Sequence, residues 1–299
     1  MNGIIDAVLT YHTNPYSCGV SKFNLALAKR LGIRCLPLLV DVPEHRYLAL
    51  RCPLVSIKPS ELPNPPTLSG TYDLFLHGAL PHTWPPGLLL HARRIFAGNH
   101  LIAHSVHKHR PDAVAAWCPS TLQGSHTRGT IDVLLFGMSH KIDTHTVYVE
   151  RLRDLLTRSG ANYTVSVSTA VHEGSPWDRV FARTSAKLEK IFGDKLRVLG
   201  YLGDDALIKA LQDCTAVALF FDPAARANNT TLWAAMEAGC AVITNLDADS
   251  PQELVHLHSV LDISRMTDWP WLPVLIDVEQ GARKAAELRS WDKLLEVLR

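Results

Sequence analysis

The sequence predicts an α/β fold made of two domains, each built on a parallel sheet. Two stretches support this prediction: strand, loop, helix and strand signals follow one another over residues 4–40, and strands alternate with helices over residues 131–244. The length of 299 residues exceeds the ~100–150 residues of a usual domain, which favours two domains. Hydrophobic residues make up 47% and charged residues 20%, which allows a large core and excludes a disordered or fibrous chain.

The start of the chain has the pattern with which a parallel sheet begins. An apolar run over residues 4–11 predicts a buried strand. Apolar residues spaced three and four apart from Val20 to Leu31 then predict a helix, and Gly32 is its expected end. A short apolar stretch over residues 34–40 predicts the next strand, which completes a strand–helix–strand unit.

Two histidines follow predicted strands of the first half. A strand over residues 71–76 is followed by His77, and a short strand over residues 101–103 is followed by His104. Open α/β sheets bind ligands where their strands end, and an imidazole there can take a proton from a substrate hydroxyl. The alternative for both is an ordinary hydrogen-bonded surface side chain.

The histidines around position 104 also raise the question of a metal. His100, His104 and His107 would share one face of a helix and could then bind zinc. The segment is predicted as a strand, however, and no cysteine or acidic residue nearby completes a ligand set. We therefore predict no metal site and expect these histidines to add positive charge when they are protonated.

The second half alternates strands and helices more regularly. Strands are expected over residues 131–136, 163–168, 196–199, 215–221 and 241–244, and helices over residues 147–157, 185–192, 204–213 and 230–238. A polar stretch over residues 120–128 marks the boundary, so we expect domains at residues 1–124 and 125–275. Residues 276–299 are expected to contain an amphipathic helix that could pack back on the first domain. Its apolar face would consist of Leu288, Trp291, Leu295 and Leu298.

Charge and cysteine content limit the expected partners and location. Lys and Arg number 30 against 29 Asp and Glu, which argues against a nucleic-acid partner because phosphate binding needs clustered positive charge. The first residues lack a secretory signal, and no apolar run reaches the ~20 residues of a membrane span, although peripheral membrane contact stays open. Six cysteines without a C-x-x-C pair are typical of a reduced cytoplasmic protein.

The segment over residues 220–245 carries the most specific chemical signal. A strand ends there in a polar loop, a helix follows, and Gly239 ends that helix just before another strand. The residues around the helix start are Asn228, Asn229, Thr230 and Thr231. Free amides and the helix dipole attract anions to such a start, and Arg226 could add two hydrogen bonds to a phosphate. The alternative is that the Asn and Thr side chains only cap the helix.

This segment resembles the signature region of GT-B glycosyltransferases, enzymes with two Rossmann-like domains that use nucleotide sugars. The matching residues are Met236, Gly239, Val242 and Ile243. Three further segments resemble the family in the same order along the chain. Residues 19–31 resemble its first loop and helix, residues 135–137 with Lys141 the first strand and basic loop of its donor domain, and residues 199–207 a segment before the signature.

The resemblance implies two Rossmann-like domains facing one another across a cleft, and transfer of a sugar from a nucleotide-diphosphate sugar to an acceptor hydroxyl. It implies a hexosyltransferase-like, retaining reaction without metal or other cofactor, and a carbohydrate, small-molecule or lipid-linked acceptor. Lys141 resembles the cation that binds the diphosphate, with a solvated loop lysine as its alternative. His104 resembles the family's histidine position more closely than His77 does. The residues of the loop that would face the cleft are Ser17, Cys18 and Gly19.

Two positions depart from the family's pattern. Retaining members often carry two glutamates eight positions apart that contact the donor, and the corresponding positions here hold Arg226 and Ala234. A catalytically silent GT-B protein that binds or supports another transferase is therefore the second hypothesis. A nucleotide-sugar epimerase built on the same two-domain plan is the third.

Overall fold

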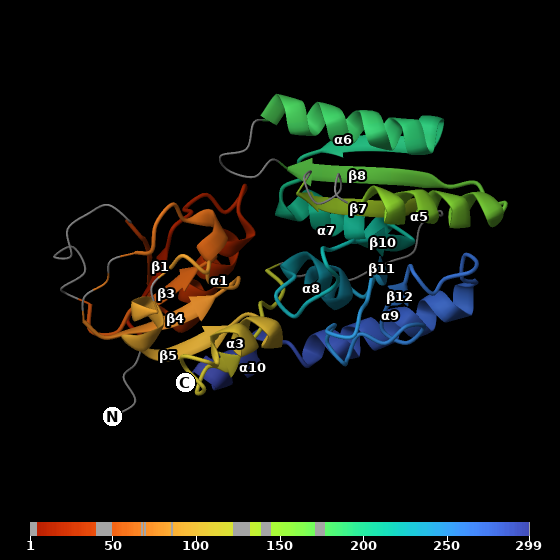
Figure 1. Ribbon diagram of the computed structural model, residues 1–299. Helices are drawn as coiled ribbons and strands as arrows, with labels where there is room; N and C mark the ends of the chain where they lie inside the picture. The colour runs from red at the N-terminus through yellow and green to blue at the C-terminus, as the bar shows by residue number, and fades with distance from the viewer. Residues whose placement is uncertain are drawn as a thin grey trace. The chain divides into compact units, whose positions relative to one another are not determined.

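The computed structural model describes residues 5–39, 50–66, 68, 70–84, 86–121, 132–138, 145–170 and 177–298. The chain forms two compact units: Met1–Thr121 with Trp291–Arg299 make the N-terminal unit, and Leu122–Ser290 make the C-terminal unit. Each unit contains a six-stranded parallel sheet with flanking helices (Figure 1), which confirms the predicted α/β class. Within the described ranges, no helix combines the length and the apolar character that a membrane span requires.

The sheet of the N-terminal unit has the strand order β2-β1-β3-β4-β5-β6. Its strands are β1 (Ala7–Thr10), β2 (Arg34–Pro37), β3 (Leu54–Ile57), β4 (Tyr72–Leu76), β5 (Ala92–Ala97) and β6 (Val114–Ala115). Its helical segments include α1 (Gly19–Leu31), the 3-10 turn η2 (Pro59–Glu61), α2 (Gly87–Leu90) and α3 (His100–Val106). The predicted strand–helix–strand start is confirmed, and Gly32 ends α1 in the left-handed conformation at φ +69°.

The segment before His104 differs from its prediction. Residues 101–103 belong to the helix α3 rather than to a strand, and the preceding strand is β5. The side chain of Asn99 starts this helix, because its Oδ1 accepts a hydrogen bond from the Ile102 amide at 3.0 Å. Ile102, Ala103 and Val106 are buried at helical spacing. The short apolar run was thus one face of a helix, which length alone could not distinguish from a strand.

The sheet of the C-terminal unit has the strand order β12-β11-β10-β7-β8-β9. Its strands are β7 (Asp132–Met138), β8 (Thr164–Ala170), β9 (Leu196–Gly200), β10 (Ala216–Ala218), β11 (Ala241–Thr244) and β12 (Leu261–Asp262). Its helical segments include α5 (Thr146–Arg158), α6 (Trp177–Phe192), the 3-10 turn η3 (Gly193–Lys195), α7 (Asp204–Asp213), α8 (Thr230–Glu237) and α9 (Leu272–Glu287). The expected alternation is confirmed, with β10 shorter and α6 longer than predicted.

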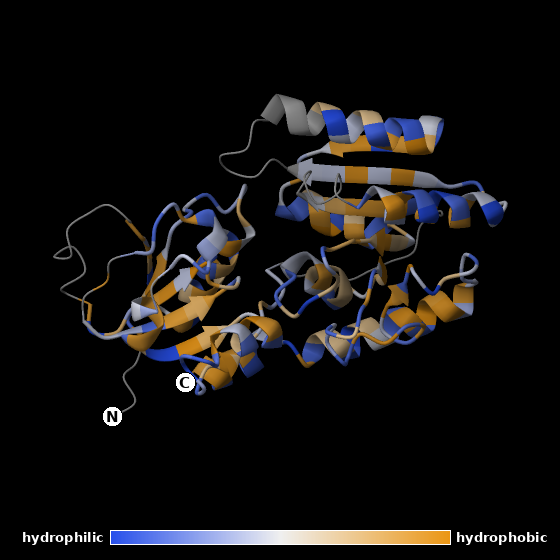
Figure 2. Ribbon diagram, viewed as in Figure 1, coloured by the Kyte–Doolittle hydropathy of each residue, from blue (hydrophilic) through white to orange (hydrophobic). Residues whose placement is uncertain are grey.

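The central strands of this second sheet are buried on both faces, which explains the apolar runs of β10 and β11. Successive residues of β7 point to opposite faces of the sheet and belong to different hydrophobic clusters. Leu134 packs with side chains of α7, α8 and α9, whereas Val133 packs with side chains of α5 and α6. Figure 2 shows the resulting apolar strands in the middle of the unit. Trp233 of α8 is 1% exposed, so the helix that carries the predicted anion site is fixed in the core.

The C-terminal segment forms two helices instead of the expected one. After α9, the amides of Leu288, Arg289 and Ser290 bond three residues back, which tightens the last turn and ends the helix. A new helix, α10 (Trp291–Leu298), belongs to the N-terminal unit. There the Trp291 ring stacks on Phe23 with centroids 5.4 Å apart, and its Nε1–H donates to the Ser120 carbonyl oxygen at 2.6 Å. Leu288, predicted on the same face, is 52% exposed.

Candidate functional site

One buried side chain holds the loop between β10 and α8, residues 219–229. Asn245 directly follows β11 and is 1% exposed. Its Oδ1 accepts from the Phe221 amide at 2.8 Å, and its Nδ2 donates to the carbonyl oxygens of Phe221 at 2.8 Å and Pro223 at 3.0 Å. Since the amide group uses both donors and its acceptor, the loop has a fixed path beside the carboxyl end of β11. Sequence reasoning missed this role, because the bonded residues lie 22 and 24 positions away.

The start of α8 has no side-chain cap. The Oδ1 of Asn229, at the capping position, instead accepts a hydrogen bond from the Arg226 amide at 2.6 Å. Within the described chain, the amides of Thr230 and Thr231 donate to no protein acceptor, and both residues are half-buried. The interpretation of these Asn and Thr residues as ordinary caps is therefore wrong for Asn229, and the helix start remains open to an anion.

The Arg226 side chain is committed to the protein. It is 8% exposed and forms two hydrogen bonds with the Asp247 carboxylate, at 2.8 Å to Oδ1 and 2.7 Å to Oδ2. A further hydrogen bond at 2.9 Å reaches the Ala225 carbonyl oxygen. Hydrogen bonding from Arg226 holds the pKa of Asp247 below its usual value. Arg226 thus ties the loop before α8 to the loop after β11, and its direct contact with a diphosphate stays a prediction.

Two further residues were predicted to bind the donor, Asn228 and Lys141, and the structure describes only the first. Asn228 lies half-buried in the same loop as Asn229. Lys141 lies outside the described residues. One loop and one helix start therefore contain the other members of the predicted set, which are Arg226, Asn228, Asn229, Thr230 and Thr231.

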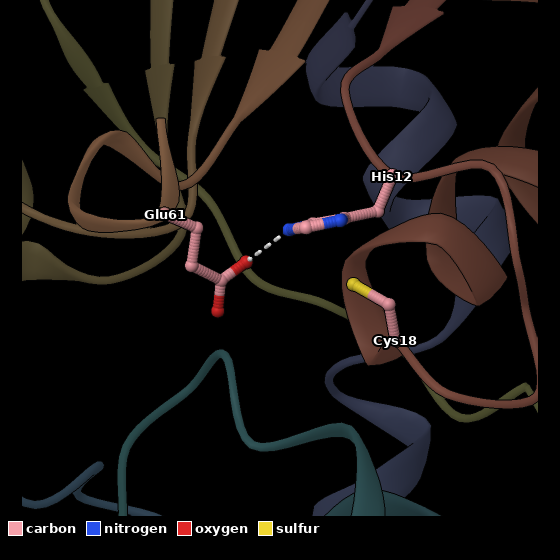
Figure 3. Close-up of side chains that lie close together, drawn as sticks. All are labelled: His12, Cys18 and Glu61. Carbon is pink, nitrogen blue, oxygen red and sulfur yellow. Dashed lines mark ion pairs between the residues drawn. The ribbon is translucent and has the colours of Figure 1, made fainter. Parts of the chain in front are cut away.

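In the N-terminal unit, the loop between β1 and α1 lies against the 3-10 turn η2. His12 Nε2 lies 3.3 Å from Glu61 Oε2, and Lys58 Nζ lies 2.6 Å from Glu61 Oε1. Figure 3 shows His12, Cys18 and Glu61 with their polar ends turned toward a common point. Their ligand atoms all lie within 4.8 Å of one another. Sequence reasoning missed this group because Glu61 is 49 positions from His12, and no local pattern marks it.

The predicted cleft-loop residues occupy the start of α1. Cys18 is its capping residue, 2% exposed, and Gly19 is its first residue and exposed. Burial raises the pKa of the Cys18 thiol, and the nearby amides of Ser21 and Val20 oppose that rise. Ser17 Oγ is buried and has no hydrogen-bond partner among the described residues. The loop therefore carries a polar group that a bound ligand could satisfy.

His77 follows β4 as predicted, but its ring is enclosed by the core. The residue is 7% exposed, with Nε2 at 2.9 Å from Ser56 Oγ and Nδ1 at 3.4 Å from Cys118 Sγ. Burial lowers the pKa of His77 to about 3, so the ring is neutral near neutral pH. These contacts make His77 part of a buried polar network. Because the ring is buried, the structure does not support the catalytic role predicted for it.

His104 lies on the exposed side of α3, and its ring meets the His107 ring edge-on at a centroid distance of 6.3 Å. His107 Nε2 lies 3.1 Å from the Ala113 carbonyl oxygen. The helical face that could have gathered three histidines thus exists. Across the residues that the structure describes, however, the group with metal-binding geometry is His12, Cys18 and Glu61 rather than these histidines.

Comparisons with known proteins support the fold rather than a close relationship. No protein-family model matches the chain, and neither does any characterised protein sequence. Among solved structures, a glycosyltransferase from Rickettsia africae matches 100% of this chain and 97% of its own, with a TM-score of 0.66 and 9% identity. Sucrose-phosphate synthase from Thermosynechococcus elongatus matches 98% of this chain and 96% of its own, with a TM-score of 0.66 and 10% identity.

HepE of Anabaena, solved in complex with UDP-glucose, matches 99% of both chains with a TM-score of 0.65 and 11% identity. Identities this low establish shared architecture and leave the reaction open. The two parallel sheets, their flanking helices and the C-terminal helix α10 agree with these structures. The chain therefore has the α/β architecture of the GT-B glycosyltransferases.

Proposed function

We propose that this protein is a glycosyltransferase that moves a sugar from a nucleotide-diphosphate sugar to an acceptor hydroxyl. The observation that carries the proposal is the uncapped start of α8, where the Thr230 and Thr231 amides are available to an anion. HepE, which shares the architecture, was solved with UDP-glucose. The C-terminal unit would bind the donor, and the N-terminal unit would supply acceptor contacts, including His104.

The proposed chemistry is electrostatic stabilisation of the leaving nucleoside diphosphate. Amide donors fixed before the reaction stabilise charge that develops on the leaving group without reorganisation. The loop before α8 is fixed in this way by Asn245 and by the Arg226–Asp247 pair. Lys141 is proposed as a further cation, and the transfer step is proposed to need no metal and to retain the anomeric configuration. Nuclear magnetic resonance of the product would give its anomeric configuration.

The acceptor is proposed to be a carbohydrate, a small molecule or a lipid-linked sugar. The six cysteines are free, which supports a reducing compartment such as the cytoplasm as the place of action.

A substitution at the helix start separates nucleotide binding from folding. Thr231→Glu places a negative charge on the first turn of α8, which favours the folded protein by about 0.3–1 kcal/mol through the helix dipole. The same charge repels a diphosphate, so we expect affinity for the nucleoside diphosphate to fall at least about tenfold, or ~1.4 kcal/mol. A thermal-shift screen of nucleoside diphosphates identifies the ligand, and calorimetry on wild type and variant measures its affinity.

Thr231→Gln is the matched control, since it has similar size and no charge. Its affinity should stay within about threefold of wild type, about 0.7 kcal/mol. Equal affinity of Thr231→Glu and Thr231→Gln would remove the α8 start from the binding site. Absence of any nucleotide binding to the folded wild type would reject the proposed function itself.

A catalytically silent protein is the second candidate, and two residues favour it. Arg226 and Ala234 occupy the positions where the resembled family carries glutamates; Arg226 is paired with Asp247, and Ala234 is 4% exposed in the core. A silent protein would bind the nucleotide and release no sugar from any donor. Incubation with nucleotide sugars and analysis of the products, with and without acceptors, distinguishes this protein from a transferase and from an epimerase.

A further inference from the structure

The N-terminal unit contains three side chains of the kinds that bind transition metals. His12 lies in the loop between β1 and α1, Cys18 is the capping residue of α1, and Glu61 is the last residue of the turn η2. An imidazole nitrogen, a sulfur and a carboxylate oxygen lie within 4.8 Å of one another and converge in space (Figure 3). All three side chains are shielded from water: Cys18 is 2% exposed, and the side chains of His12 and Glu61 are 14% and 15% exposed.

The spacing of these atoms fits a tetrahedral ion. Bonds of about 2.0–2.3 Å around a tetrahedral zinc separate neighbouring ligand atoms by roughly 3.3–3.8 Å. His12 Nε2 and Glu61 Oε2 already lie 3.3 Å apart, and the widest separation in the group is within 4.8 Å. Small side-chain rotations would therefore bring all three atoms to bonding distance. The sulfur and nitrogen ligands favour zinc over magnesium or calcium, which prefer oxygen.

Charge also suits a divalent cation. The Glu61 carboxylate and a Cys18 thiolate would together offset both charges of the ion. Lys58 contacts the other carboxylate oxygen, Oε1, and leaves Oε2 turned toward His12. Such an outer partner orients a ligating carboxylate rather than competing for the same oxygen.

The simpler alternative is an ion pair between His12 and Glu61. It accounts for the 3.3 Å contact but not for the thiol that converges on the same point. It also leaves the buried hydroxyl of Ser17, the residue before Cys18, without a partner among the described residues. Buried hydroxyls are almost always hydrogen-bonded. A metal with three protein ligands keeps a water in its fourth position. Such a water is a hydrogen-bonding group of the kind that the Ser17 hydroxyl lacks.

We propose that His12, Cys18 and Glu61 bind one zinc ion, with a water as its fourth ligand. The ion would join the loop between β1 and α1 to η2 within the N-terminal unit. No metal is invoked for the proposed transfer step, so either proposal can fail without the other.

The test uses the full chain after treatment with a chelator. Zinc is titrated in competition with a chromophoric chelator, and cobalt(II) is added in parallel as a spectroscopic substitute. We expect one zinc per chain and a cobalt spectrum with a thiolate-to-metal charge-transfer band. The variants Cys18→Ala, His12→Gln and Glu61→Gln should each weaken zinc binding at least tenfold, and Cys18→Ala should abolish the band.

Two control variants test whether the binding is local to this site. Cys35→Ala removes a half-buried thiol of β2, and His104→Gln removes the centre of the exposed histidine group on α3. Both should bind zinc as the wild type does. Circular dichroism verifies that each variant is folded.

Three results would overturn the proposal. They are wild-type zinc affinity equal to that of Cys18→Ala, loss of binding in His104→Gln, and a wild-type cobalt spectrum without a thiolate band. The last result needs no variant, so the proposal stays open to refutation even if Cys18→Ala does not fold.

Discussion

The two units each place a strand–loop–helix junction next to a parallel sheet, and the two junctions differ in charge. In the C-terminal unit, α8 begins with open amides, and the nearby acid, Asp247, is paired with Arg226. In the N-terminal unit, α1 begins at the thiol of Cys18, and Glu61 and His12 lie within reach of it. Neither helix has a side-chain cap.

The two proposals assign opposite ligands to junctions of the same topology. A helix start alone favours anions, and at α8 the Asp247 carboxylate is paired with Arg226. At α1 the carboxylate of Glu61 brings negative charge to the same kind of junction, close to the Cys18 thiol, whose pKa burial raises. The flanking side chains, more than the helix itself, therefore decide which ligand each junction is suited to bind.

The largest expected effect is the pH dependence of stability that His77 causes. Its measurement tests whether His77 belongs to the core rather than to the N-terminal junction. Its pKa is about 3 in the folded protein against 6.5 as the ordinary value. Unfolding therefore takes up a proton below pH 6.5. The stability that the neutral, buried His77 contributes is complete above pH 6.5 and is lost as the pH falls toward 3. The expected slope is about 1.4 kcal/mol per pH unit, or ~2–3 kcal/mol between pH 6.5 and 4.5.

Urea unfolding of the wild type and of His77→Gln at several pH values measures this contribution. The variant should lose that part of the acid slope, whatever its stability at pH 7.5. Identical slopes for the two proteins would place a titrating, solvent-accessible imidazole at the end of β4 and return His77 to the candidate site.

The next effect concerns the rigidity of the junction at α8. A double-mutant cycle with Arg226→Ala and Asp247→Ala should give a coupling energy of about 1–2 kcal/mol, because the pair is charged and doubly hydrogen-bonded, with Arg226 8% exposed and Asp247 35% exposed. Since the pKa of Asp247 is lowered by Arg226, the coupling should be present above the ordinary pKa of about 3.9 and disappear as the pH falls below it.

The exposed pair Arg153–Asp154 serves as the control for that cycle. Its side chains are 38% and 55% exposed, and a comparable distance of 2.7 Å should give a coupling below about 1 kcal/mol. Equal coupling for the two pairs would mean that burial does not strengthen the contact at α8, and the account of a pre-fixed loop would fail.

The smallest expected effect on stability is at His104. His104→Ala removes an exposed side chain of α3 and should change the free energy of unfolding by no more than about 0.5 kcal/mol. Asn99→Ala, which removes the cap of the same helix, should cost about 1 kcal/mol and shows that the measurement is sensitive enough. A stable His104→Ala protein with full transfer activity would exclude His104 as the acceptor-side base.

Local patterns were sufficient for much of the fold. The spacing of apolar residues and Gly32 located α1, and the alternation of strand and helix signals located most of the C-terminal sheet. The error at residues 101–103 arose because a short apolar run fits a strand or a helix, and the Asn99 cap decided between them. The break between α9 and α10 depends on Trp291 packing against Phe23, a contact across 268 positions that periodicity does not encode.

The candidate sites show the same limit. The anion site at the start of α8 was predicted from a contiguous segment and stays a prediction, and the missing side-chain cap of this helix became visible only in the structure. The partner of Arg226 is 21 positions away, and the partner of His12 is in another turn altogether. Side-chain partners that tertiary folding brings together decide whether a charged residue binds a ligand or binds the protein.

Amide resonances of the α8 start test the central claim most directly. Selective ¹⁵N labelling of threonine and titration with the nucleoside diphosphate found in the thermal-shift screen would follow the amides of Thr230 and Thr231. The account predicts that both resonances shift with the same affinity as calorimetry measures, while the buried Thr184 of α6 stays in place. Saturating nucleotide binding that leaves Thr230 and Thr231 unshifted would contradict the account.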